Sequence, residues 1–299
     1  MKYTQTMLLA IVSVTIPVVT CSGKSKELDN PFYCFNNGVR VLPNSPDGFE
    51  AKAALAKKIG FDGLAGRVED YYQWRQAMDS VGLAMTEIYV KMEIDQDGQP
   101  KYPENLNDIL IHSRDRDLLV ALHLHNDGKI KDWQKVDKVF VEGIQKLADF
   151  CMPLGVKIAI YPHTWFHCET TSHAVTLTKA INRRNVGVVF NLCHYLKVEG
   201  SENWRESLKP ALPYLFMVSI NGADTGDTRN LGWDKLIQPL GEGSFDTYEL
   251  VKFLKDNGYD GLFGLQCYNI KQDCEQALTK SMNTWKSYKE RYHQENNSK

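Results

Sequence analysis

Apolar runs of strand length alternate with helical patterns along most of this chain. Eight runs have the length and flanking residues of buried β-strands, and they cover residues 31–35, 61–65, 83–90, 118–124, 156–161, 186–191, 214–220 and 261–266. Between these runs, apolar residues recur at the spacing of one helix face, as at Phe49, Ala53 and Ala56. The expected helices cover residues 48–59, 69–81, 102–115, 132–150, 172–183, 201–209, 245–257 and 272–292.

Eight strand–helix repeats predict a single α/β domain with a closed parallel sheet. We expect a (β/α)8 barrel of the TIM type over residues 31–292, followed by a polar tail at residues 293–299. Such a barrel typically needs about 250 residues, which this segment provides. An open, doubly wound sheet is the competing architecture. It is disfavoured because no G-x-G-x-x-G turn follows the first strand.

Four joints between a predicted helix and the next strand share a glycine. They are K-K-I-G-F-D-G-L at residues 57–64, D-S-V-G-L at residues 79–83, M-P-L-G-V-K-I at residues 152–158 and K-D-N-G-Y-D-G at residues 255–261. Glycine ends a helix in the left-handed conformation, and a strand then begins. These joints therefore mark the bottom of the barrel, and functional residues are expected at the opposite, carboxyl-terminal ends of the strands.

The first residues have the pattern of an export signal rather than of the fold. Lys2 precedes an apolar run at residues 7–19, which is too short to span a bilayer and has the length of a signal-peptide core. The segment resembles a bacterial lipoprotein signal, with residues 1–20 removed, Cys21 lipidated and residues 21–30 forming a polar tether. An ordinary secretory signal is the alternative. Either way we expect the domain to be exported, to the periplasm or the cell surface, and to touch a membrane only through its lipid anchor.

Charge and cysteine content argue against several classes of partner and site. The formal net charge is −2 and no basic block occurs, so nothing in the chain indicates a nucleic-acid partner. Apart from Cys21, six cysteines are scattered without C-x-x-C spacing. This spacing argues against a disulfide scaffold and against a thiolate zinc site.

Polar, aromatic and histidine residues gather where the predicted strands end. Because side chains alternate along a strand, those of one parity face the barrel mouth together. The predicted ligand-binding residues are Tyr161, Asn191, Asn221, Gln266, Tyr268, His123 and His125. Neutral hydrogen-bonding groups beside aromatic rings suit a polyhydroxylated small molecule, so we expect a carbohydrate ligand. The alternative is that these side chains only satisfy strand-end backbone groups and one another.

His194 and His163 are the predicted catalytic residues, because an imidazole titrates near neutral pH and can move protons on a sugar. Together with His123 and His125 they also offer an alternative, a site for zinc or another transition metal. Carboxylates are scarce at the predicted mouth, and no glycosidase-type pair is evident. The plausible ones are Glu87, Glu169 and Asp224.

Four motifs carry a resemblance to a known family. They are K-I-G-F-D-G at residues 58–63, N-V-G-V-V-F-N-L-C-H at residues 185–194, Q-P-L-G-E-G-S-F-D at residues 238–246 and N-G-Y-D-G at residues 257–261. With them, almost the whole chain after the signal segment resembles the sugar phosphate isomerase/epimerase superfamily, the xylose isomerase-like TIM barrels. In metal-dependent members the fifth strand ends in a Glu ligand, the sixth in Asp-x-x-His, the seventh in a His ligand and the eighth in a second Glu.

At the matching places this chain carries uncharged residues. They are Tyr161, Asn191 followed by His194, Ser219 and Gln266. Mg²⁺ and Mn²⁺ need anionic oxygen ligands, which these side chains do not provide. The resemblance combined with this departure implies that no metal cofactor binds at these positions.

The resemblance implies an enzyme of carbohydrate metabolism. We expect an isomerase, an epimerase or a lyase that acts on a neutral sugar by metal-free, histidine-assisted proton transfer at the barrel mouth. The alternative is an exported sugar-binding protein without catalytic activity, which the loss of the metal ligands favours; the fold by itself does not decide between them. Phosphorylated substrates are not expected, because no cluster of Arg and Lys is evident at the predicted mouth.

Overall fold

The computed structural model describes residues 27–128 and 130–297. The predicted signal peptide, the lipidation site Cys21 and most of the tether lie outside these residues, so export and lipidation stay predictions. Within the described part of the chain, none of the helices is both long and apolar enough to cross a membrane.

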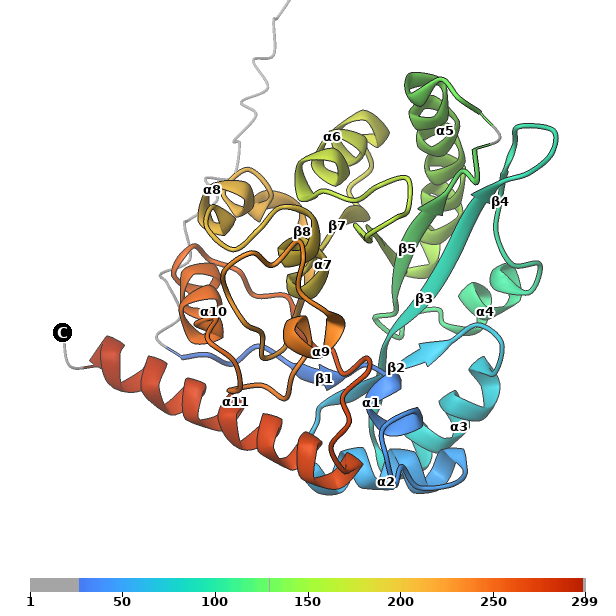
Figure 1. Cartoon of the computed structure of the whole chain (residues 1–299). Coiled ribbons are helices and arrows are strands. Elements are labelled where there is room, and N and C mark those ends of the chain that lie inside the picture. The colour runs from blue at the N-terminus through green and yellow to red at the C-terminus, as the bar shows by residue number, and fades with distance from the viewer. Residues whose placement is uncertain (1–26, 129, 298–299) are drawn as a thin grey trace, which may run out of the picture.

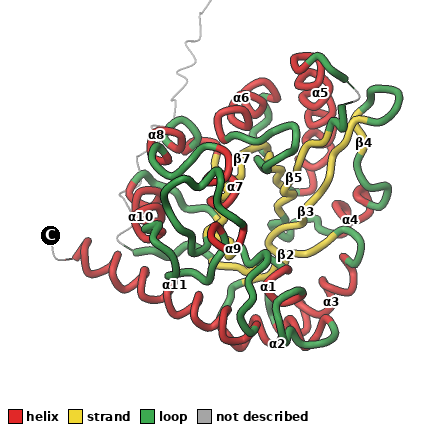
Figure 2. Tube along the Cα trace, viewed as in Figure 1, coloured by secondary structure: helices red, strands yellow, loops and turns green. Residues whose placement is uncertain are grey.

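Eight parallel strands close into a barrel with helices around it (Figures 1 and 2). The strands are β1 (Phe32–Cys34), β2 (Gly63–Arg67), β3 (Ala84–Ile94), β5 (Leu119–His125), β6 (Lys157–Ile160), β7 (Val186–Asn191), β8 (Leu215–Ile220) and β9 (Leu262–Leu265). They pair in this order, and β1 pairs with both β2 and β9, which closes the sheet. The predicted closed barrel is confirmed.

A ninth strand, β4 (Pro100–Lys101), lies outside this ring. It pairs antiparallel with Glu93 and Ile94 at the far end of β3, which is longer than the run predicted at residues 83–90. In Figure 1 this hairpin extends beyond the barrel wall beside α4 and α5. A strand of two residues has no periodicity that a sequence pattern could register.

Helices occupy all the positions predicted between strands. They are α2 (Phe49–Ile59), α3 (Tyr71–Val81), α4 (Leu106–His112), α5 (Trp133–Cys151), α6 (Thr171–Ile181), α8 (Trp204–Leu208), α10 (Thr247–Asp256) and α11 (Cys274–Asn297). The last of these continues past the predicted boundary at Tyr292. Two 3₁₀ turns, η1 (Met152–Leu154) and η2 (Leu212–Tyr214), precede β6 and β8.

The sequence pattern misses three short helices. They are α1 (Asn37–Arg40), α7 (Leu192–Val198) and α9 (Trp233–Leu236). Each has one or two turns, so no apolar face repeats along it. All three follow the carboxyl ends of strands, on the side of the barrel where a site is expected.

Two apolar clusters hold the barrel together. The inner one is formed by alternate strand residues, including Tyr33, Ala121, Val189 and Met217. The larger one lies between the strands and the surrounding helices. Because alternate side chains point to opposite faces of a strand, each strand contributes to both clusters.

The predicted glycine joints are present at the bottom of the barrel. Gly60 (φ +107°) ends α2 and Gly82 (φ +64°) ends α3 in the left-handed conformation, and β2 and β3 begin shortly afterwards. Other residues rarely adopt this conformation, which explains glycine at these positions.

The last helix covers the place where the first and last strands meet. In α11, Trp285 stacks on Phe32 of β1 with ring centroids 4.5 Å apart and contacts Phe263 of β9 at 5.2 Å. Figure 1 shows α11 running along the outside of the barrel past β1. The barrel closure therefore depends on residues from the two ends of the domain.

Candidate active site

A cavity of about 770 Å³ opens at the carboxyl-terminal ends of the barrel strands. Its walls come from the ends of β1, β2 and β9, from residues within β3, from the segment after β6 and from the segments around α1, α7 and α9. This volume suits a small metabolite. The cavity lies on the side of the barrel where the strand-end residues predicted a site.

Five of the predicted site residues line this cavity. They are Tyr161, His163, His194, Gln266 and Tyr268. The other four do not, and they are Asn191, Asn221, His123 and His125. In each of these four residues at least one polar atom bonds to a neighbouring side chain or backbone group.

Asn191 is buried, and its side chain bonds to other protein groups rather than lining the cavity. Its Oδ1 accepts from the backbone N–H of Cys193 at 3.1 Å and of His194 at 3.4 Å, so it caps the amino end of α7. Its Nδ2 donates to the hydroxyl of Tyr161. The predicted direct contact of Asn191 with ligand is therefore replaced by a role in holding two residues of the wall.

Asn221 is also fully buried, and its Nδ2 donates to the carbonyl oxygens of Gly222 and Leu236, each at 2.7 Å. It thereby fixes the segment that leads from β8 to α9. Ser219, two residues earlier on the same strand face, is buried as well and has no hydrogen-bond partner for its Oγ among the described residues. Neither side chain lines the cavity.

His123 and His125 form a stacked layer behind the cavity wall. His123 Nδ1 lies 2.6 Å from His125 Nε2, and the His123 ring stacks on Tyr89 at 4.0 Å between centroids. Burial, with the neighbouring His125, lowers the pKa of His123 to about 2. Both rings also contact Phe166. The pair is a neutral packing layer, because a charged imidazole there would lose its hydration.

His163 and His194 are in contact in the cavity wall, with ring centroids 3.8 Å apart and ring planes tilted by 41°. His163 Nδ1 is 2.8 Å from the carbonyl oxygen of Thr164, and His194 Nδ1 is 3.1 Å from the Thr164 hydroxyl. Burial lowers the pKa of His163 to about 4 and lowers that of His194 well below its usual range, where the adjacent His163 adds to the effect. Both rings are therefore neutral at neutral pH.

Glu87 is the functional candidate that the sequence prediction left out of the site. It lies on β3, is fully buried and still lines the cavity, and neither of its carboxyl oxygens has a hydrogen-bond partner among the described residues. Desolvation raises the pKa of Glu87 to about 8, and the nearby Tyr33 hydroxyl opposes this shift. The signal available in the sequence was a single carboxylate within the apolar run 83–90, two residues before Tyr89, whose side chain packs against the inner cluster.

The other two carboxylates considered from the sequence have different roles. Glu169 accepts a hydrogen bond from the backbone N–H of Trp165 and closes a turn. Asp224 accepts from the backbone N–H of Ser244 at 3.3 Å. Neither lines the cavity.

Cationic side chains line one part of the rim, which corrects the expectation of a mouth without an Arg and Lys cluster. Arg40 of α1, Arg67 at the end of β2 and Lys271 after β9 all line the cavity. Burial and the nearby Arg67 lower the pKa of Arg40. Arg67 pairs with Glu69 at 3.1 Å, whereas Arg40 has no ion pair within the described chain. Three segments far apart in sequence supply this cluster, so no local pattern reveals it.

Aromatic rings form the rest of the outer wall. Trp165 is 72% exposed and Tyr268 is 54% exposed, although both line the cavity. Trp233 of α9 contacts Trp165 edge-on at 6.0 Å and His194 at 5.5 Å. Exposed rings beside polar groups provide apolar surface for the C–H faces of a sugar.

The four positions that match the family's metal ligands do not fit a hard cation. Asn191 Oδ1 is used by the cap of α7, and Gln266 Oε1 accepts from the backbone N–H of Cys267 and Tyr268 and from the Asn37 amide. Tyr161 is buried, and burial raises its pKa far above the usual value, so its hydroxyl stays neutral. No anionic oxygen is left for Mg²⁺ or Mn²⁺ at these positions.

The group with metal-ligating geometry lies elsewhere. Among the described residues, Asp137, His167 and His173 bring three candidate ligand atoms within 4.8 Å of one another. None of these three residues lines the cavity. The alternative metal site on the mouth histidines stays a prediction, and this group is a second candidate, outside the mouth.

The chain is similar to known TIM barrel proteins. A family model described as xylose isomerase-like TIM barrel matches residues 53–288. Inosose isomerase of Bacillus licheniformis is 28% identical over 153 residues, which cover 50% of this chain and 53% of that protein. Inosose isomerase of Bacillus subtilis is 27% identical over 172 residues, which cover 56% of this chain and 60% of that protein. The aligned region thus spans little more than half the length of these curated relatives.

Solved structures share the fold over nearly the whole domain. An IOLI protein with a bound zinc atom has a TM-score of 0.69 and 18% identity, covering 88% of this chain and 99% of that one. The 3-keto-D-glucoside 4-epimerase YcjR from E. coli has a TM-score of 0.66 and 15% identity, and the match covers 86% of this chain and 99% of that one. D-psicose 3-epimerase of Clostridium cellulolyticum, solved with D-tagatose, has a TM-score of 0.65 and 15% identity, and the match covers 86% of this chain and 98% of that one.

Proposed function

The chain belongs to the xylose isomerase-like TIM barrel family, and we propose that it is a carbohydrate isomerase or epimerase working by proton transfer. One observation carries the proposal: the cavity is lined by a buried acid and a buried base with separated pKa values. The pKa of Glu87 is raised to about 8, and that of His163 is lowered to about 4. At neutral pH the acid holds its proton and the base is free to accept one.

His163 supplies the base. A carbonyl oxygen only accepts hydrogen bonds, so His163 Nδ1 donates to the Thr164 carbonyl and the lone pair of the neutral ring is on Nε2. Nε2 takes a proton from a carbon next to a substrate carbonyl. The C–H bond breaks, and its electron pair forms the carbon–carbon double bond of an enediol. His194 packs against this ring and keeps its orientation.

Glu87 supplies the acid. Its proton passes to the substrate carbonyl oxygen as the enediol forms, which avoids leaving a negative oxygen in a dry cavity. In the second half of the reaction the neighbouring hydroxyl of the enediol returns a proton to Glu87 and becomes the new carbonyl. His163 then gives its proton to the other carbon, so atoms and charges balance over the cycle.

The cavity supports a keto sugar or a ketocyclitol as the substrate class. The curated relatives are named for inosose, a carbonyl-bearing cyclitol, and a structural neighbour is named for a 3-keto-glucoside. Trp165 and Tyr268 offer ring faces to such a molecule. Arg40 and Lys271 on the rim would also accept a carboxylate substituent, so substrates with and without a negative charge belong in the same test.

The decisive experiment measures solvent proton exchange. The purified protein is incubated in D₂O with a panel of inososes, ketoses and keto-uronates, and deuterium uptake at the carbon next to the carbonyl is followed by NMR. We expect uptake with at least one member, and a loss of about 10²–10⁴-fold in His163→Ala, which removes the general base. His293→Ala, on the exposed part of α11, is the matched control and should keep full activity.

Two outcomes contradict this proposal in different ways. Sugar binding by calorimetry without deuterium uptake would assign the non-catalytic, sugar-binding alternative, which the uncharged residues at the family's metal-ligand positions favour. Uptake that persists in His163→Ala would move the base to another residue, and His194→Ala is then the next variant to test.

A further inference from the structure

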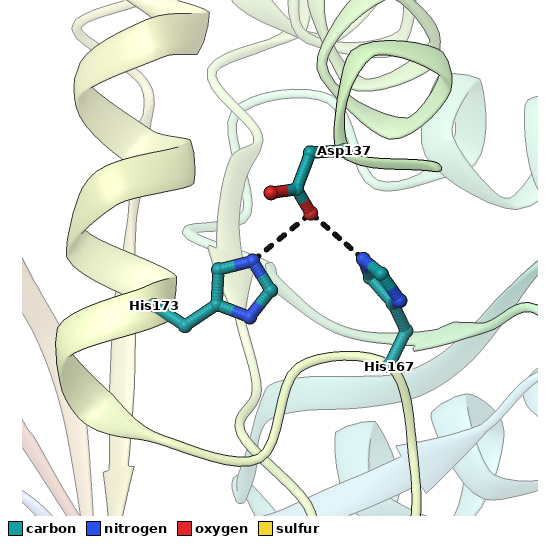
Figure 3. Close-up of side chains that lie close together, drawn as sticks. All are labelled: Asp137, His167 and His173. Atoms are coloured by element: carbon teal, nitrogen blue, oxygen red, sulfur yellow. Dashed lines mark hydrogen bonds and ion pairs between the residues drawn. The ribbon is translucent and has the colours of Figure 1, made fainter. Parts of the chain in front are cut away.

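A second cluster of chemically capable side chains lies behind the loop that carries His163. Asp137 of α5, His167 of the loop between β6 and α6, and His173 of α6 point toward one another (Figure 3). The Nε2 atoms of the two histidines lie 2.7 Å and 2.9 Å from the same oxygen, Oδ1 of Asp137. Two imidazoles and one carboxylate therefore converge on a single point.

The surroundings of this cluster are closed on one side and open on the other. The side chain of His167 is fully buried, and the ring of Trp133 lies 4.0 Å from it between centroids. The side chains of Asp137 and His173 keep 27% and 17% of their surface exposed. A ligand reaching Oδ1 and the two Nε2 atoms would thus have protein behind it and water in front.

We propose that Asp137, His167 and His173 bind a first-row transition-metal ion, with Zn²⁺ as the representative. Neutral imidazole nitrogen and carboxylate oxygen are ligands that suit zinc and its neighbours, and three protein ligands leave positions for water. The ion takes the place of the two Nε2 protons. Each ring then carries its proton on Nδ1, so both imidazoles stay neutral, and the carboxylate leaves the site with a net charge of +1.

The geometry needs only a small adjustment. Zinc lies about 2.0–2.2 Å from nitrogen and oxygen ligands, so the ligand atoms must be roughly half an ångström farther apart than in the hydrogen-bonded cluster. The three residues come from two helices and one loop. These segments can move apart by about half an ångström without disrupting the hydrogen bonds of a strand.

A bound ion would connect the active-site loop to the helices behind it. His167 and His163 are four residues apart in the same segment, and His163 N–H donates to the Cys168 carbonyl at 2.9 Å. His167 N–H donates to the Leu124 carbonyl of β5, also at 2.9 Å. A metal on His167 therefore restrains the segment that holds His163 in the cavity. An effect of that restraint on catalysis rests on the proposed function. The metal site itself does not depend on the proposed function.

Calorimetric titration with ZnCl₂ tests the site on the full, chelator-treated protein without any measurement of turnover. We expect one Zn²⁺ per chain, and binding more than about tenfold weaker in Asp137→Asn, which keeps the shape of the side chain and removes its charge. His173→Ala, at a partly exposed position, should lose binding similarly and serves as the second variant if Asp137→Asn unfolds. His293→Ala is the control and should bind as the unmodified protein does.

Two results would overturn the proposal. One is no zinc binding at micromolar protein and metal; the cluster would then be a hydrogen-bonded link between α5 and α6. The other is binding that Asp137→Asn leaves unchanged and His163→Ala removes, which assigns the ion to the mouth histidines. Hydrogen exchange of the amides in residues 163–170 should slow when Zn²⁺ is added, and unchanged exchange would disprove the restraint of the loop.

Discussion

At the scale of single residues, burial decides the chemistry of this cavity. A carboxyl group normally ionises in water, but Glu87, within β3, is fully buried, and its carboxyl oxygens have no hydrogen-bond partner among the described residues. Its proton is retained because a buried, unpaired carboxylate is costly. The same desolvation removes the proton from His163. An acid and a base thus coexist at neutral pH among the residues that line the cavity.

Glu87→Gln should remove a pH dependence of stability. Since the pKa of Glu87 is about 8 in the folded protein against 4.5 for the free side chain, the folded state binds more protons than the unfolded state between these values. The free energy of unfolding therefore falls as pH rises through this window, by up to about 1.4 kcal/mol for each pH unit. In Glu87→Gln this contribution is absent, so the variant gains stability relative to the unmodified protein as pH rises.

Urea denaturation of both proteins at several pH values between about 5 and 8 measures this difference. Glu290→Gln, at an exposed position on α11, is the control for the loss of one acidic side chain. A difference that stays constant across the window would mean that Glu87 is already ionised in the folded protein, and its proposed role as an acid would be wrong.

At the scale of elements, the junction of β7 with α7 builds one wall of the site. Asn191 ends the strand and caps the helix, so the helix begins at once and places Cys193 and His194 at the cavity. The same amide holds the hydroxyl of Tyr161, which directly follows the neighbouring strand β6. One side chain therefore sets the relative position of a strand, a helix and a neighbouring wall residue.

Asn191→Ala should cost about 2–4 kcal/mol of stability. The variant loses an N-cap, worth about 1 kcal/mol, and leaves the buried Tyr161 hydroxyl without its partner, which costs about 1–3 kcal/mol. Asn191→Asp is the matched variant, because it keeps the acceptor oxygens and the side-chain shape, and its loss should be less than half as large. Chemical denaturation measures both. Equal losses would show that the cap does not stabilise this junction.

At the scale of the whole molecule, the first and last segments of the domain close the barrel. β1 pairs with β9, and α11 covers that seam through Trp285, which is almost fully buried between Phe32 and Phe263. Closure also brings α1 and the residues after β9 together, so the cationic part of the rim exists only in the complete barrel. The site therefore depends on contacts between residues more than two hundred positions apart.

Trp285→Ala should destabilise the whole domain by about 3–5 kcal/mol, because a large buried ring is replaced by a cavity. Tyr72→Ala removes another aromatic side chain, but Tyr72 is 51% exposed, and its loss should cost about 1 kcal/mol or less. Thermal and urea denaturation compare the two variants. A loss for Trp285→Ala as small as that for Tyr72→Ala would show that α11 does not stabilise the closure.

The sequence by itself determined the architecture and much of the cavity wall. Strand and helix periods are local properties of the chain, and eight strand runs with glycine-ended helices are compatible with few folds. Strand alternation also placed Tyr161, His163 and Gln266 in the wall of the cavity, where the structure has them, and His194 joins them from the first turn of α7.

Only the tertiary structure decided which of these groups is free to act and in what protonation state. Asn191 and Asn221 have the right residue type at the right strand end, but both are buried. The Asn191 amide bonds to the start of α7 and to the Tyr161 hydroxyl, and the Asn221 Nδ2 donates to backbone carbonyl oxygens. The roles of Glu87, the cationic rim and the Asp137 cluster follow from burial and from contacts between distant segments. Desolvation and hydrogen-bond satisfaction belong to the folded environment, and no local pattern of residues records them.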